Sequence, residues 1–247
     1  MVARPVPAPH PAVEVVGLDF RYRGGEGLAL RGVDLRVAPG SRCVLIGRNG
    51  AGKTTLLRVL GGRHLVPPDA VRVLGRPAFH DTALAGLVAF LGGTFPFTVD
   101  VRVREILARA HAEDPARRDR LVRLLGVDRE WHMDRVSDGQ RRRVQLLLGL
   151  MNPSAVLLLD EVTSDLDLCA RADLLAFLRE ESDRGATILY ATHVLDELEA
   201  WATHLVLMED GAIRRMAPLD DIAEIQALRA AGVASPLTRA ALGWLRR

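Results

Sequence analysis

The stretch GRNGAGKTT, residues 47–55, contains the only lysine among the 33 basic residues of a 247-residue chain. It follows a short apolar segment, 41–47, and precedes a segment with apolar residues at helical spacing, 53–62. Glycines in such a turn let backbone N–H groups point at phosphate oxygens, and the helix that follows adds partial positive charge. We therefore predict a phosphate-binding loop formed by Gly47, Arg48, Asn49, Gly50, Ala51, Gly52, Lys53, Thr54 and Thr55.

The single lysine indicates that this loop requires a particular kind of positively charged side chain. A loop wrapped closely around a phosphate needs a slim side chain that ends in a compact charge, whereas the planar fork of arginine suits two-point contacts. We predict that Lys53 reaches the β- and γ-phosphates and that Thr54 supplies a hydroxyl to magnesium. The competing interpretation, a glycine-rich turn with an incidental lysine, does not explain why the only lysine occurs here.

A second motif, AVLLLDE (155–161), places two carboxylates after an apolar strand. Two acids at the end of a buried strand are costly unless a cation or a proton transfer needs them. We predict that Asp160 holds magnesium through water and that Glu161 polarises the attacking water. In isolation the pair could be a solvated acidic turn, but beside a phosphate-binding loop it predicts hydrolysis of a nucleoside triphosphate.

Composition and charge set limits on the partners. The chain is 49% hydrophobic and 26% charged, which is typical of a globular protein. Its net charge of +2 is too balanced to indicate nucleic acid, and the basic run RRR, 141–143, is interpreted as a solvated helix face. We therefore expect no direct binding of nucleic acid.

Apolar runs and cysteines predict the compartment. The longest apolar runs, such as AVLLL (155–159), fall far short of the roughly 20 residues that a membrane-spanning helix needs. The proline-rich leader, 1–12, lacks the apolar core of a signal peptide. Cys43 and Cys169 fit no metal-ligand or disulfide spacing. We therefore expect a cytoplasmic protein with reduced cysteines and no membrane span of its own.

Segments of strand and helix character alternate along the chain. Strands are predicted at 13–22, 32–40, 41–47, 70–77, 86–93, 155–161, 186–193 and 204–211. Helices are predicted at 102–112, 116–127, 138–151, 170–185 and 194–202, followed by two short helices at the end of the chain. This alternation predicts an α/β fold with a mostly parallel sheet, interrupted by an inserted helical lobe at about 94–151.

Two further motifs narrow the class. VSDGQ (136–140) precedes a predicted helix, and ATH (191–193) ends a predicted strand. Together with Lys53 and Glu161, this order of motifs resembles the ATP-binding-cassette ATPases. The resemblance implies a P-loop NTPase core with a small antiparallel β-subdomain and an inserted helical subdomain. It divides the chain into a flexible leader (1–12), an ATPase domain (13–215) and a helical C-terminal tail (216–247).

The resemblance assigns the VSDGQ segment to a neighbouring subunit's nucleotide. Ser137, Gly139 and Gln140 would contact the γ-phosphate of ATP held by the opposite subunit, with the positive end of the following helix pointing at the phosphate. Asp138 replaces the glycine that is commoner at this place in the family. Because an acid beside a phosphate is unfavourable, we expect Asp138 to weaken the closed dimer.

Three other segments take roles by resemblance. His193 would be the switch histidine that contacts the γ-phosphate and the attacking water. The loop SDLD (164–167), with Ser164, Asp165 and Asp167, would cross the dimer interface. Tyr22 stands where the family places an aromatic ring against adenine, although simple packing is an alternative for this ring.

One expected residue is missing. The family has a glutamine after the strand equivalent to 86–93, where it binds magnesium and couples the nucleotide site to a membrane partner. Here that position is Gly92 or Gly93, and no glutamine precedes Gln140. The stretches GRHLV (62–66), AFHDT (78–82) and FLGGTF (90–95) further resemble a group of stand-alone members of the family, the plant I subfamily and a fungal relative associated with the carbon-catabolite-repression and deadenylase complex.

The resemblance and the missing glutamine lead to three functional hypotheses. The first is a soluble, regulatory ATPase that binds Mg²⁺ and ATP in a head-to-tail homodimer and acts on a soluble partner. The alternative is the motor subunit of a transporter whose membrane permease is encoded separately. The last is a weakly active adaptor that binds ATP with little or no hydrolysis, for which the missing glutamine and the extra acids at 138 and 165 are the support.

Overall fold

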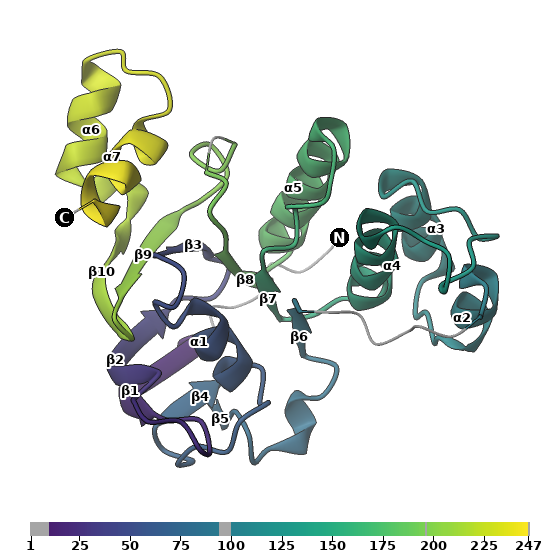
Figure 1. The fold of residues 1–247 in the computed structure, drawn as a ribbon, viewed down its shortest axis with the longest axis horizontal. Helices are drawn as coiled ribbons and strands as arrows, with labels where there is room; N and C mark the ends of the chain where they lie inside the picture. The colour runs from purple at the N-terminus through teal and green to yellow at the C-terminus, as the bar shows by residue number, and fades with distance from the viewer. Residues whose placement is uncertain (1–9, 94–99, 196, 247) are drawn as a thin grey trace.

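A computed structural model describes residues 10–93, 100–195 and 197–246 (Figure 1). Most of the predicted leader, 1–9, and the start of the predicted helical subdomain, 94–99, lie outside the described residues. The described strands form two sheets, one of six strands and one of four.

The larger sheet has the strand order β10-β9-β3-β8-β7-β6. Its parallel strands are β3 (Arg42–Ile46), β6 (Val88–Leu91), β7 (Val156–Asp160), β8 (Thr187–Ala191) and β9 (His204–Glu209). Every residue of β7 and β8 is buried, as expected for parallel strands covered on both faces. The carboxyl ends of the parallel strands meet at one edge of the sheet, and this edge carries the residues that follow each strand.

The smaller sheet is antiparallel, as predicted, with the order β2-β1-β4-β5. Its strands are β1 (Val13–Phe20), β2 (Leu30–Val37), β4 (Val71–Val73) and β5 (Arg76–Pro77). Val33, Leu35 and Val37 alternate along β2 and are all buried. Helix α1 (Lys53–Leu60) packs between the two sheets, because its buried leucines belong to the same apolar cluster as strands from both.

Helices α2 (Val103–Arg109), α3 (Pro115–Leu124) and α4 (Asp138–Leu150) form a separate lobe beside β6, on the right in Figure 1. Asp114 accepts a hydrogen bond from Ala116 N and caps α3, whose first residue is proline. Ser137 caps α4 in a capping box with Gln140. Helix α5 (Leu168–Asp183) joins α4 in the second large apolar cluster, on the face of the sheet away from α1.

The described chain ends in two short helices, as predicted. The 3-10 turn η2 (Leu219–Asp221) leads into α6 (Ala223–Ala230) and α7 (Pro236–Leu245), which pack against each other beside β9 and β10 (Figure 1). Arg215 of β10 makes a two-point ion pair with Glu224 of α6, and its guanidinium lies 4.9 Å from the ring centre of Trp244. A second 3-10 turn, η1 (Thr82–Leu84), precedes β6.

Two sequence expectations about this half of the chain were wrong. The segment 194–202 forms turns in its described part rather than a helix, although Leu195, Leu198 and Trp201 are buried at helical spacing. Its backbone hydrogen bonds from Leu198 to Leu195 and from Trp201 to Leu198 span three residues, and the Trp201 carbonyl accepts from Arg42 of β3, so tertiary contacts override the local pattern. Strand β10 (Ala212–Pro218) was not expected. It forms a hairpin with β9 through Asp210-Gly211, where both residues have positive φ (49° and 81°), and Asp-Gly is a strong sequence signal for such a turn.

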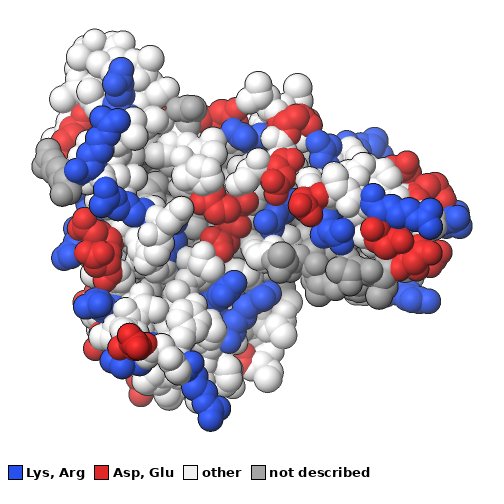
Figure 2. Space-filling model, in the orientation of Figure 1, with Lys and Arg blue, Asp and Glu red and all other residues white. Residues whose placement is uncertain are grey.

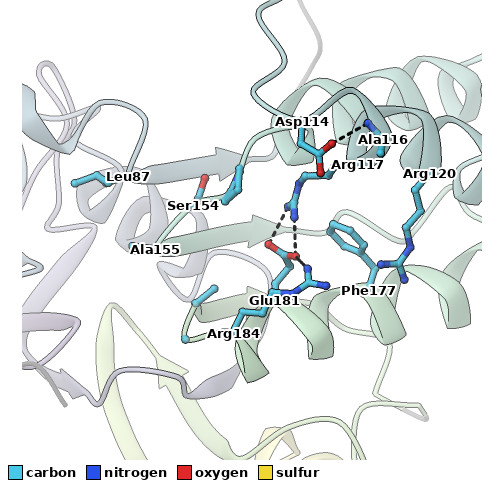
Figure 3. A pocket seen from close by; sticks show the side chains of 13 residues that line it. Leu87, Asp114, Ala116, Arg117, Arg120, Ser154, Ala155, Phe177, Glu181 and Arg184 are labelled. Atoms are coloured by element: carbon cyan, nitrogen blue, oxygen red, sulfur yellow. Dashed lines mark hydrogen bonds and ion pairs between the residues drawn. The ribbon is translucent and has the colours of Figure 1, made fainter. Parts of the chain in front are cut away.

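Two ion pairs, one of them buried, connect the helical lobe to the core at the amino ends of the parallel strands (Figure 3). Arg117 of α3 donates two hydrogen bonds to Glu181 of α5, at 2.7 and 2.8 Å, and both side chains are almost fully buried. Arg120 and Glu180 make a second, half-exposed pair, and both arginines lie over the ring of Phe177. Arg117, Arg120, Phe177 and Glu181 line a cavity of about 750 Å³.

Charged side chains of both signs cover the lobe of α2 and α3. On the face shown in Figure 2, basic and acidic residues alternate over this lobe. Ion pairs such as Arg104–Glu130 and Arg129–Asp119 lie there, so the lobe carries mixed charge. Within the described residues, no helix combines the length and apolar character needed to cross a membrane.

We predict that the buried pair stabilises the fold far more than its exposed neighbour. Glu181→Ala leaves the Arg117 guanidinium buried without its carboxylate and should lower the free energy of unfolding by about 3 kcal/mol. Glu180→Ala removes a half-exposed carboxylate from the same helix and should cost about 1 kcal/mol or less. Urea unfolding followed by circular dichroism measures both, and equal losses would contradict the assignment.

Candidate functional site

The predicted phosphate-binding loop connects β3 to α1 at the carboxyl edge of the larger sheet. Gly47 lies so close to the neighbouring strand β9 that a Cβ at this position would be 2.4 Å from Met208 O. The loop therefore requires glycine where it leaves the sheet. Helix α1 begins at Lys53, so its N-terminus, which carries partial positive charge, faces the loop. Its first turn has no acidic residue that would neutralise this charge.

The Lys53 ammonium is held by the loop itself. Its Nζ donates to the carbonyl oxygens of Gly47 and Arg48 at 2.7 and 3.1 Å. Desolvation lowers the pKa of Lys53, while the nearby carboxylates of Glu161 and Asp160 act in the opposite direction. The charge thus lies in a partly desolvated loop, where it interacts strongly with an anion.

Thr54 and Asp160 meet across the end of β7. Thr54 Oγ1 donates to Asp160 Oδ1 at 3.1 Å, so the two residues predicted to hold magnesium are in contact. Burial raises the pKa of Asp160, and the adjacent charge of Glu161 raises it further. A hydroxyl and a buried carboxylate are the hard oxygen ligands that Mg²⁺ prefers, and a dication there would relieve the cost of the buried charge, so these residues fit the metal.

Glu161 has an unusual backbone and an unsatisfied side chain. Its φ is +52°, a conformation that non-glycine residues rarely adopt, and its N–H donates to Ala191 O at the end of β8. Its Oε2 lies 2.9 Å from His193 Nδ1 as an ion-pair contact, yet this buried oxygen makes no well-aligned hydrogen bond with any described group. A buried acceptor of this kind suits a water molecule awaiting activation.

These groups surround one cavity of about 320 Å³. It is lined by Ala29, Asn49, Gly50, Ala51, Gly52, Lys53, Thr54, Thr55, Asp160 and Glu161. Tyr22 adjoins it, because its hydroxyl lies 3.0 Å from Thr55 Oγ1. The Tyr22 ring is 37% exposed and contacts Phe20 and His64 edge to face, so both the adenine role and the packing role are compatible with its position.

The VSDGQ segment lies elsewhere in the chain's own fold. Ser137, Asp138, Gly139 and Gln140 form the beginning of α4 in the helical lobe, apart from α1 (Figure 1), and none of them lines the cavity. Ser137 Oγ accepts from Gln140 N, and Gln140 Oε1 accepts from Ser137 N. Within a single copy of the chain, the VSDGQ segment therefore lies apart from the cavity.

The SDLD loop, between β7 and α5, contacts helix α4 of the helical lobe. Ser164 Oγ donates to Glu161 O at 3.3 Å, and Asp165 O lies where a Cβ on Gly139 would approach it to 3.0 Å. Asp167 caps α5 by accepting from Ala170 N, and Arg143 pairs with the same carboxylate at 2.7 Å. The hydrogen bond from Ala170 and the pair with Arg143 hold the pKa of Asp167 below its usual value.

Two residues near the cavity, Tyr190 and Ala29, were not predicted from the sequence. Tyr190 in β8 makes a hydrogen bond of 2.5 Å to Thr163, two residues after Glu161, and both side chains are buried. Ala29 lines the cavity from the segment before β2. Neither belongs to a motif, because their contribution depends on which strands are neighbours, and one sequence does not reveal that.

A group of three other possible metal ligands, Asp100, His132 and Asp134, lies in the helical lobe. His132 Nδ1 contacts Asp100 at 2.5 Å, and Arg102 donates to His132 Nε2 at 2.9 Å. Both ring nitrogens are thus engaged within the protein, and the hydrogen bond from His132 lowers the pKa of Asp100. We interpret this group as a structural connection of the lobe.

The fold and the arrangement of motifs define an ATP-binding-cassette ATPase. A model of the family described as "ABC transporter" matches residues 30–164, more than half of the chain, and the chain belongs to this family. The enzyme class is ATP hydrolase. A solved structure of the ATP binding subunit of an ABC transporter superimposes with a TM-score of 0.79 over 96% of this chain and 100% of its own, at 23% identity, which supports the fold.

Two relatives have much higher sequence identity. ABC transporter I family member 20 of Arabidopsis thaliana is 43% identical over 95% of this chain and 76% of its own length. CCR4-associated factor 16 of Saccharomyces cerevisiae is 36% identical over 82% of this chain and 77% of its own. The predicted resemblance to the plant I subfamily and its fungal relative is confirmed.

Lysine at position 53 should not be replaceable by arginine. Lys53→Arg keeps the charge, but its fork does not fit between the carbonyls of Gly47 and Arg48, so we expect at least a roughly tenfold loss of ATP hydrolysis. Phosphate release measures it, with Lys53→Ala as the inactive reference and the exposed Arg36→Lys as the control. Activity of Lys53→Arg equal to wild type would contradict this prediction.

Asp160 should destabilise the metal-free fold. The pKa of Asp160 is raised above the ordinary 3.8, so the folded chain binds a proton at this carboxylate more tightly than the unfolded chain does. The free energy of unfolding therefore decreases as pH rises through the raised pKa. Asp160→Asn should therefore resist urea better than wild type at about pH 7.5 without magnesium, with the difference vanishing toward about pH 4. The exposed Asp173→Asn is the control, and a pH-independent difference would contradict burial of the Asp160 charge as the cause.

Proposed function

We propose that two copies of this chain associate head to tail around two molecules of ATP, hydrolyse it, and act on a soluble partner protein in the cytoplasm. The observation that carries the proposal is the separation of the two half-sites. Lys53, Thr54 and Asp160 lie in one cavity, while the beginning of α4 lies in the other lobe. A second copy, turned to face the first, would supply Ser137 and Gly139 to the open side of the cavity.

The contacts described above support the following roles within each proposed site. Lys53 and the loop N–H groups bind the β- and γ-phosphates, and Tyr22 lies against adenine. Thr54 and Asp160 hold Mg²⁺, which when bound neutralises charge on the phosphate oxygens. Glu161 accepts a proton from the attacking water through its unsatisfied Oε2, and His193 holds that carboxylate in place and contacts the γ-phosphate.

The preference for a soluble partner rests on the missing glutamine and on the relatives. Gly92 and Gly93 offer no side chain at the place where the family couples the nucleotide to a permease. Of the two relatives compared above, one belongs to the plant I family and the other is a yeast factor named for its association with CCR4.

The motor subunit of a transporter is the second candidate. Membership of a family described as "ABC transporter" supports it, and so do the exposed Leu65 and Phe79, which could contact another protein. The third candidate, an adaptor with little hydrolysis, has support only in the missing glutamine and in Asp138 and Asp165, because the expected hydrolytic side chains are all present.

The dimer is tested with Glu161→Gln. This variant keeps the shape of the side chain but does not accept the proton, so we expect ATP and Mg²⁺ to convert it from monomer to dimer with turnover reduced at least about a hundredfold. Size-exclusion chromatography with light scattering measures the mass, and Lys53→Ala is the control that should stay monomeric. A Glu161→Gln chain that remains monomeric with saturating magnesium and ATP would overturn the proposed dimer.

The partner is tested by a pull-down from native cells with the same variant. A soluble protein recovered in stoichiometric amount with Glu161→Gln, and lost with the double variant Glu161→Gln/Lys53→Ala, would support the soluble role. An integral membrane protein recovered under these conditions would instead establish the transporter role.

A further inference from the structure

One face of α4 follows the end of β6. At Gly149 the helix packs closely on the Leu91 side chain of β6, because a Cβ there would be 2.0 Å from Leu91 Cδ2. One turn earlier, Gln145 Nε2 donates to Gly92 O at 3.4 Å. Residues 142, 145 and 149 have the spacing that places them on one side of a helix. This face is therefore in contact with successive residues at the strand end.

Arg142 extends this contact to two loops at once. Its Nη1 donates to Gly93 O at 3.1 Å and to Gln145 Oε1 at 2.6 Å. Its Nε lies 3.8 Å from Asp165 Oδ2, in the loop that follows Glu161. The side chain is 17% exposed, so these interactions are partly shielded from water. Arg142 thus connects the segment after β6 to the segment after β7.

Gly92, which accepts a hydrogen bond from Gln145 of α4, lies next to Asp160. A Cβ on Gly92 would lie 2.5 Å from Asp160 Cβ and 3.3 Å from Asp160 O. No side chain fits there, and the backbone itself forms the wall beside Asp160. A displacement of this backbone toward β7 would therefore meet the Asp160 side chain.

We propose that Arg142 and Gln145 are positioning residues for magnesium-dependent hydrolysis. They hold Gly92 and Gly93 against Asp160 and connect this wall to the helix that begins at Ser137. A change at the start of α4, where a second copy would bind, then reaches the magnesium site through α4 itself rather than through a glutamine side chain from the loop. This inference rests on the proposed function, in which Asp160 holds Mg²⁺.

The test compares Arg142→Ala, Arg142→Lys and Gln145→Glu with wild type. Gln145→Glu keeps the size of the side chain and can pair with Arg142, but it cannot donate to Gly92 O, so it separates positioning from folding. Arg142→Lys keeps a positively charged donor, so its Mg²⁺ requirement should lie between those of the wild type and Arg142→Ala. Arg123→Ala, an exposed arginine of α3, controls for the loss of charge from the same lobe.

Two readouts are needed. The first is thermal stabilisation by a non-hydrolysable ATP analogue as Mg²⁺ is titrated, where Arg142→Ala and Gln145→Glu should require about tenfold more Mg²⁺ for half the effect. The second is hydrolysis, where kcat should fall about tenfold or more while KM for ATP changes less than about twofold. A purely structural role would lower the melting temperature without moving the Mg²⁺ requirement.

The outcomes distinguish this inference from the proposed function. A tenfold rise in the Mg²⁺ requirement, with Arg123→Ala unchanged, supports the inference. An active wild type whose variants keep a Mg²⁺ requirement within twofold overturns this inference alone. A wild type without magnesium-dependent hydrolysis overturns the proposed function and this inference with it.

Discussion

The hydrogen bond between Thr54 and Asp160 is the contact on which the site depends. It joins the first turn of α1 to the end of β7, two elements that are far apart in the sequence. Asp160 is buried and its pKa is raised, so the fold accepts an unfavourable charge at this point. That cost makes the site a place where a cation is favourable, and Lys53 and Glu161 line the same cavity.

The surrounding contacts keep that carboxylate in a fixed position. Lys53 lies on one side, bound to the loop carbonyls, and Gly92 forms the wall on another. Glu161, the next residue, occupies a left-handed backbone conformation that directs its side chain to His193. Strain at one residue is tolerated because its neighbours on β7 and β8 are fully buried and hold the backbone.

The sequence predicted which segments meet at the cavity because its motifs are local. The loop 47–55 and the pair Asp160-Glu161 can each be recognised from a few consecutive residues. Each follows an apolar run that predicts a buried strand, and both line the cavity. The segment 194–202 has buried residues at helical spacing but forms turns, and the edge strand β10 was missed because its residues are only partly buried and show no clear alternation. The contacts of Arg142 and Gln145 with Gly93 O and Gly92 O were beyond prediction, since a backbone carbonyl of another element leaves no trace in the sequence.

The ion pair between Arg117 and Glu181 has a mechanical consequence. It fastens the helical lobe to the core at the amino edge of the sheet, whereas the face of α4 fastens it at the opposite, carboxyl edge. Helices α3 and α4 also share the large apolar cluster with β7, β8 and α5, so the two polar attachments add to apolar packing between them. Loss of either attachment alone leaves the lobe packed on the sheet, and because the two lie at opposite edges, their contributions to its orientation should add independently.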